Sequence, residues 1–218
     1  MKLLSILTFA LLLVGCSGEQ ISHNITKTQI AMSGNKPPAF FSVANIETMR
    51  DYIFNAKDFS FKFPTAKQSD FNKMGGWKGG SSRNGKTITL YLKSMYHMDV
   101  STSGNVLDYG ERARAVENKD QSYITYVRKK YQYPKNTKLY YGMYGKENYN
   151  CMIKERKDKF NRYKASYDCY KYNPTRTNAN SVTVSLTYSQ SSSKQYTYQD
   201  LKQRAKRTLD SLYIKDGW

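Results

Sequence analysis

The sequence predicts an α+β domain, a largely antiparallel sheet with two or three packed helices, one of them at the C-terminus. Some segments alternate apolar and polar residues, which is the period of a half-buried strand. Other segments repeat apolar residues at helical spacing, and the order of the two kinds is typical of this class. The 218 residues are enough for one sizeable core.

Four segments begin the domain. Residues 43–55 carry apolar side chains at helical spacing, which predicts a helix. Residues 59–63 alternate strictly until Pro64, which predicts a strand. Residues 64–85 are expected to be a Gly-rich connection, and residues 86–95 alternate as a second strand.

The middle of the domain mixes both patterns. Residues 111–117 lean towards a helix, and residues 122–131 have helical spacing that Pro134 ends. Residues 138–144 begin a β-rich part, and residues 181–188 form a clean alternating strand.

The last helix is the clearest. Thr197 can cap it, and Asp200 completes a pattern that resembles a capping box. Its apolar stripe is formed by Leu201, Ala205, Leu209 and Leu212. The cations expected to face water are Lys202, Arg204, Lys206 and Arg207.

Two cysteines fix the register of a predicted hairpin. Residues 148–156 and 163–172 flank a polar turn, and folding them together places Cys151 opposite Cys169 and Ile153 opposite Tyr167. A disulfide across this pair is expected to contribute about 3 kcal/mol. Redox or metal roles are disfavoured, because the spacing is not C-x-x-C and two thiols are too few ligands.

The N-terminus carries an export pattern. Lys2 is followed by twelve largely apolar residues, too few to span a bilayer, and the run ends in Leu13-Val14-Gly15-Cys16. This resembles the lipobox of bacterial lipoproteins. The resemblance implies that residues 1–15 are a removed signal peptide, that Cys16 carries diacylglycerol and an acyl chain such as palmitate, and that Ser17 directs the protein to the outer membrane. An ordinary secretory signal is the alternative.

The remaining chain divides into a tether and a domain. Residues 16–38 lack periodicity and are expected to hold the domain off the membrane. Residues 39–218 are expected to form a single periplasmic α+β domain. Loss of Lys2 with the signal lowers the net charge by one, from +18 to +17, which favours anionic partners.

The sequence offers no catalytic set and no cofactor motif. Its two histidines, His23 and His97, have no neighbours that would complete a metal site or a catalytic triad. Residues 75–80 lack the spacing of a phosphate-binding loop. They are interpreted as a plain surface loop or as a binding loop that presents Trp77.

Tyrosine is the most informative residue type. Twelve of the twenty tyrosines lie between Tyr123 and Tyr172, among lysines and arginines. Part of this set is expected to pack in the core, and the rest to form a recognition face. The residues assigned to that face are Tyr140 or Tyr141, Tyr144, Tyr149, Tyr170, Lys154, Arg156 and Arg162, with Trp77 as a second candidate.

Three functions are compatible with these features. The first is a non-catalytic, membrane-anchored lipoprotein that binds an acidic protein. In overall plan, although not in any diagnostic motif, the chain resembles the immunity lipoproteins of type VI secretion systems, which implies inhibition of a secreted toxin. The second is binding of an anionic polymer such as DNA, lipopolysaccharide or wall glycan. The third is an envelope enzyme, for which no residue pair stands out.

Overall fold

The computed structural model of the chain describes residues 41–43, 53–83, 85–92, 96–102, 107–108, 110–157, 162–189 and 197–216. The expected signal peptide, Cys16, the tether and His23 lie outside these residues. Within them, no helix is long and apolar enough to cross a membrane.

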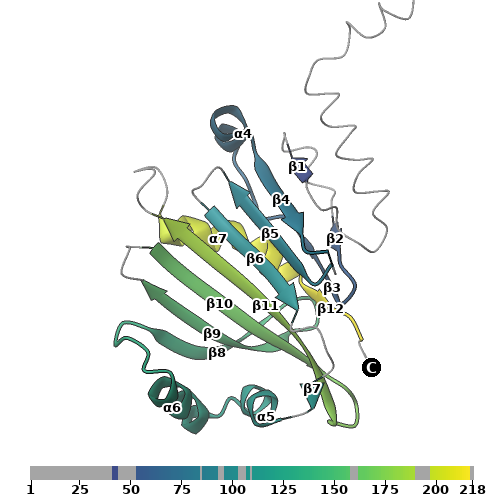
Figure 1. Ribbon diagram of the computed structural model, residues 1–218, viewed down its shortest axis with the longest axis vertical. Coiled ribbons are helices and arrows are strands. Elements are labelled where there is room, and N and C mark those ends of the chain that lie inside the picture. Colours follow the sequence, from purple (N-terminus) through teal and green to yellow (C-terminus); the bar gives the residue numbers. More distant parts are fainter. Residues whose placement is uncertain are drawn as a thin grey trace, which may run out of the picture.

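The described strands form one large antiparallel sheet and one small one (Figure 1). The large sheet runs in the order β1 (Phe41–Val43), β4 (Trp77–Ser81), β5 (Thr87–Leu92), β6 (Tyr96–Thr102), β11 (Asn178–Ser189), β10 (Arg162–Tyr172), β9 (Tyr149–Lys157) and β8 (Lys138–Tyr144), and β7 (Leu107–Asp108) also pairs with β11. The small sheet has the order β12 (Tyr213–Ile214), β3 (Phe59–Lys62) and β2 (Ile53–Asn55).

The main core lies on one face of the large sheet, which we call the inner face. Ile153, Tyr167 and Val184 stand side by side there and are at most 1% exposed. The small sheet and helix α7 (Tyr198–Ser211) cover them, and Figure 1 shows α7 behind the large sheet. The phenylalanines of β2 and β3 interlock with this layer, since Phe54 lies against Phe61 with ring centroids 5.6 Å apart.

A second helical layer covers part of the opposite, outer face. Helices α5 (Glu111–Glu117) and α6 (Gln121–Lys130) lie at the end of the sheet formed by β8, β9 and β10 (Figure 1). A smaller cluster of Val116, Met152, Tyr170 and Ala179 is buried between α5 and the strands. The sheet is therefore sandwiched at this end, while the outer faces of β9, β10 and β11 continue beyond the helices.

The predicted fold class is confirmed. The structure is an α+β fold with mainly antiparallel strands and a C-terminal helix. Its described residues contain four helices, which are α5, α6 and α7 together with α4 (Gln68–Met74). The hairpin register is as predicted, with Cys151 paired with Cys169 and Ile153 with Tyr167. The two cysteines form a disulfide. Thr197 caps α7, where its side chain accepts a hydrogen bond of 3.1 Å from the Asp200 backbone.

The expected helix over residues 43–55 is wrong at both ends. Val43 closes β1 and residues 53–55 form β2, while the residues between them lie outside the described part. Phe54 is only 2% exposed while Ile53 and Asn55 face solvent. This strand alternation is imposed by pairing with β3, and tertiary pairing overrides a weak local preference.

The Gly-rich connection is also more ordered than the sequence predicts. It contains α4 and β4, and Trp77 is 1% exposed in the main core. Trp77 is therefore not presented on a surface loop, which corrects its assignment as a binding residue. The glycines of β4 take part in the ladder, since Gly79 pairs with both Phe41 and Leu90.

Candidate functional site

Two of the predicted recognition tyrosines are buried. Tyr149 is 4% exposed on the inner face, where its hydroxyl accepts a hydrogen bond of 3.0 Å from the Ile214 backbone. Tyr170 is 5% exposed on the outer face beneath α5, and burial raises its pKa to about 12. The prediction that these rings face outward is wrong, because both faces of the sheet are covered at this end.

The other predicted tyrosines are half-buried and join layers together. Tyr140 and Tyr141 do lie on opposite faces of β8, as predicted from their adjacency. Tyr140 donates a hydrogen bond of 2.9 Å to Glu155, and Tyr141 donates one of 2.7 Å to the backbone carbonyl of Asp120. Tyr144 packs edge-on against Tyr167, with ring centroids 5.1 Å apart. Their rings serve mainly as packing.

The predicted cations, in contrast, share one surface. Lys154 and Arg156 alternate along β9 and Arg162 lies on β10, all on the outer face. Lys164, which the sequence reasoning missed, lies directly opposite Arg156. Like charges opposite each other destabilise a sheet.

These cations surround a hollow on the uncovered part of the sheet, which we call the basic hollow. It has a volume of about 250 Å³ and is lined by Lys154, Arg156 and Lys164, together with neutral residues of β10 and β11 such as Ser166, Ser185 and Thr187. No carboxylate is among its lining residues in the described part of the chain. Within the described lining, an anionic group that approaches this hollow meets cations and neutral residues.

A second hollow, the tyrosine recess, lies between α6 and the sheet. It has a volume of about 240 Å³, and its walls include Tyr123, Tyr131 and Tyr133. The rings of Tyr131 and Tyr133 stack with centroids 5.7 Å apart, and the Lys154 ammonium stands 5.4 Å from the Tyr133 ring centroid. Lys154 lines both hollows, so the two adjoin at this residue.

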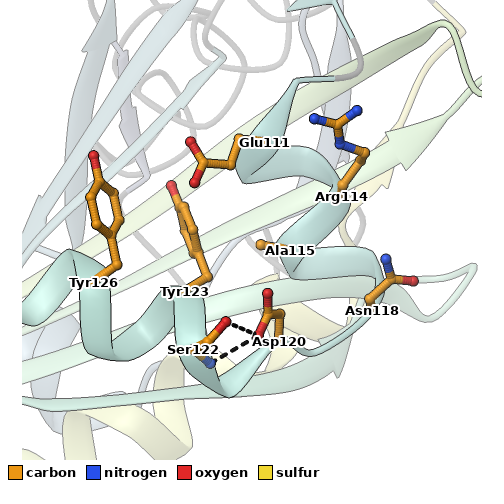
Figure 2. A pocket seen from close by; sticks show the side chains of 8 residues that line it. All are labelled: Glu111, Arg114, Ala115, Asn118, Asp120, Ser122, Tyr123 and Tyr126. Carbon is orange, nitrogen blue, oxygen red and sulfur yellow. Dashed lines mark hydrogen bonds between the residues drawn. The ribbon is translucent and has the colours of Figure 1, made fainter.

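The third hollow is the cleft between α5 and α6, drawn in Figure 2, with a volume of about 510 Å³. Tyr123 and Tyr126 project from α6 in the same direction, and the Glu111 carboxylate lies beside Tyr123. Asp120 caps α6, where its carboxylate accepts hydrogen bonds from the backbone and the hydroxyl of Ser122. Tyr123 also lines the recess, so the cleft extends the same surface.

The ends of the two helices position these tyrosines. Lys119 and Gln132 follow α5 and α6 in the left-handed region, with φ of 53° and 47°. Each closes a Schellman motif, for example through the hydrogen bond from the Tyr133 backbone to the Arg128 carbonyl. The reversal at Gln132 brings Tyr133 back beside Tyr131. The reversal at Lys119 lets α6 start at once beside α5.

We define the recognition face as the basic hollow, the tyrosine recess and the α5–α6 cleft together. Its exposed rings are not those that the sequence indicated. Tyr126 and Tyr131 are 45% and 58% exposed, because Ile124 and Val127 form the buried stripe of α6. The spacing of Ile124 and Val127 was the available signal, and it leaves Tyr126 on the solvent side.

The face combines cations with aromatic rings. Among the described residues, no three His, Cys, Asp or Glu side chains gather where they could hold a metal ion. The comparisons with known proteins give no match to a family model, to a curated protein or to a solved structure.

Proposed function

We propose that this protein is a membrane-anchored lipoprotein of the cell envelope that binds an acidic protein partner through the recognition face. The proposal rests on one observation above all, the cations of the basic hollow. Arg156 and Lys164 oppose each other on neighbouring strands, and the described residues that line the hollow supply no carboxylate. Cations gathered in one hollow attract an anionic partner and complement an acidic surface.

Aromatic rings beside this charge support a protein as the partner. Tyrosine and arginine are enriched at the centres of protein interfaces, where they supply large contact areas. The exposed Tyr131 adjoins the recess, which joins the basic hollow at Lys154. In one concrete form, the partner is a secreted toxin and the lipoprotein protects the cell that makes it.

The lipid anchor is tested first. Cys16→Ala is expected to abolish incorporation of a clickable fatty acid, because the sulfur that accepts the diacylglycerol is gone. Ser17→Asp is the matched control, and it should keep the label while more of the protein fractionates with the inner membrane. Label that persists in Cys16→Ala would contradict a lipoprotein.

The partner is tested by photocrosslinking in intact cells. With p-benzoylphenylalanine in place of Ser185, which lines the basic hollow, we expect a discrete crosslinked protein. The same group in place of Gln203, exposed on α7, should give none. Combining Arg156→Glu with Lys164→Glu should reduce the yield about tenfold or more, since charge complementarity is reversed.

This double variant is chosen so that folding stays comparable. It replaces one like-charge pair by another at the same register, so the stability of the sheet should change little. Lys57→Glu with Lys146→Glu changes the net charge equally at exposed positions away from the face and should leave the yield unchanged. An equal loss in both double variants would show that only the net charge matters.

Binding of an anionic polymer predicts a different outcome. A DNA duplex or lipopolysaccharide would bind with an affinity that falls steeply with salt, because counterions are released from the polymer. A duplex that binds in this way, together with the absence of any crosslinked protein from Ser185, would overturn the protein-partner proposal.

A further inference from the structure

The tyrosine recess has the size and the floor of a side-chain pocket. Val127 and Met152, which are 4% and 6% exposed, contribute to its lining from α6 and β9. Its volume of about 240 Å³ is below the roughly 300–1,000 Å³ of pockets for drug-sized ligands. One aromatic side chain suits this volume better than a cofactor does.

The lining of the recess favours an aromatic ring over an aliphatic chain. Tyr131 and Tyr133 stack on each other. The remaining edges and faces of these two rings can contact a third ring at the spacings that aromatic pairs prefer. Met152 adds a thioether, which makes favourable contacts with aromatic rings. Tyr131 is 58% exposed, and an inserted ring would cover part of it.

The charges at the recess favour a neighbouring carboxylate. Arg112 is engaged by Asp168, whose other oxygen accepts a hydrogen bond of 2.7 Å from Thr183. Lys154 is the second cation, and it stands over Tyr133 at the junction with the basic hollow. Two cations against one carboxylate leave the lining positive, and Lys154 is the group best placed to receive a negative charge.

We propose that the tyrosine recess receives an aromatic side chain that the acidic protein partner carries next to a carboxylate. The ring enters beside Tyr133 and Met152, and the adjoining carboxylate pairs with Lys154. The inference rests on the proposed function and names the anchor by which the partner is recognised. The basic hollow then receives the acidic residues that flank the anchor.

The test is a titration of the full chain, labelled at methionine methyls and backbone amides, followed by NMR. The probes are the peptides acetyl-Glu-Asp-Phe-Asp-Glu-amide, its Phe-to-Ala counterpart, and acetyl-Lys-Lys-Phe-Lys-Lys-amide. Met152→Leu assigns the reporting methyl. The acidic Phe peptide should shift the Met152 methyl saturably through the ring current, and the other two peptides should not. Tyr133→Ala should weaken this binding about two- to tenfold. Tyr91→Ala, on β5 and lining none of the three hollows, should leave it unchanged.

Every other outcome contradicts one part of the proposal. If the amides of Arg156 and Lys164 shift while the Met152 methyl does not, the recess holds no anchor although the basic hollow still binds acidic peptide. Equal effects of the Phe and Ala peptides exclude the aromatic ring, and an equal effect of the Lys peptide excludes the carboxylate. No shift with any peptide overturns the inference, whereas the photocrosslinking from Ser185 tests the proposed function independently.

Discussion

Replacing Asp70 by Asn is expected to lower the free energy of unfolding by about 3 kcal/mol, because it leaves the charge of Arg204 buried without its main partner. The Asp70 and Arg204 side chains are 0% and 4% exposed and form an ion pair between α4 and α7. Asp70 also accepts a hydrogen bond of 2.7 Å from the Lys67 backbone, so one carboxylate holds both helices. Asp200 lies 3.4 Å from Arg204 and still compensates part of its charge. The loss is therefore expected at the low end of the range for breaking a buried ion pair.

Urea denaturation of the Asp70→Asn variant measures this loss. The matched control is Asp210→Asn, which removes an exposed pair with Lys206 on the same helix. That control is expected to cost no more than about 0.5 kcal/mol. Equal losses in the two variants would show that burial of the Asp70–Arg204 pair has no energetic consequence. Combining Asp70→Leu with Arg204→Met should recover much of the stability, because apolar replacements remove the charge and its partner together.

The role of Arg204 illustrates what a sequence pattern omits. Helical spacing places Leu201, Ala205 and Leu209 on one stripe of α7, and all three are buried as predicted. The same spacing assigns Arg204 to water, but this prediction is wrong. Its partner Asp70 lies 134 residues away, on a helix in a segment expected to be a connection. A local period carries no information about such a partner.

The hairpin, in contrast, was predictable because two patterns in the sequence agree on its register. Strand alternation and the two cysteines constrain the same register, and Cys151, Cys169, Ile153 and Tyr167 fall where both require. The covering of the outer face by α5 was missed, although the strands contain a signal for it. Met152 and Tyr170 are large and apolar on a face that is otherwise polar, which indicates a second packed layer at that end.

The candidate site was likewise predictable only in part. Alternation along β9 was enough to place Lys154 and Arg156 on one face. Arg162 was expected in the polar turn, and it instead begins β10 on the same face. The recess and the cleft depend on the positions of α5 and α6 and of the segment that follows α6. These positions are set by the left-handed residues Lys119, between the two helices, and Gln132, after α6. Neither is a glycine or an asparagine, so the sequence gives no turn signal there.

Removing the disulfide by Cys151→Ala with Cys169→Ala is expected to lower the free energy of unfolding by about 3 kcal/mol. The two cysteines are 18 residues apart and 0% exposed, and they join the paired strands β9 and β10. Most of the effect arises in the unfolded chain, which gains the freedom that the closed loop removes. Alanine is preferred to serine, because a hydroxyl buried there would add a desolvation cost of its own.

Urea denaturation of the oxidised protein, of the reduced protein and of the double variant separates these contributions. The reduced protein should resemble the double variant, and both should unfold at lower urea concentration than the oxidised protein. Peptide mapping without reductant should recover one fragment linked through Cys151 and Cys169 from the native protein. Two free thiols in that material, or a double variant as stable as the oxidised protein, would contradict a stabilising bond. Removing the bond should affect stability more than partner binding, because the bond lies on the inner face, opposite Lys154 and the basic hollow.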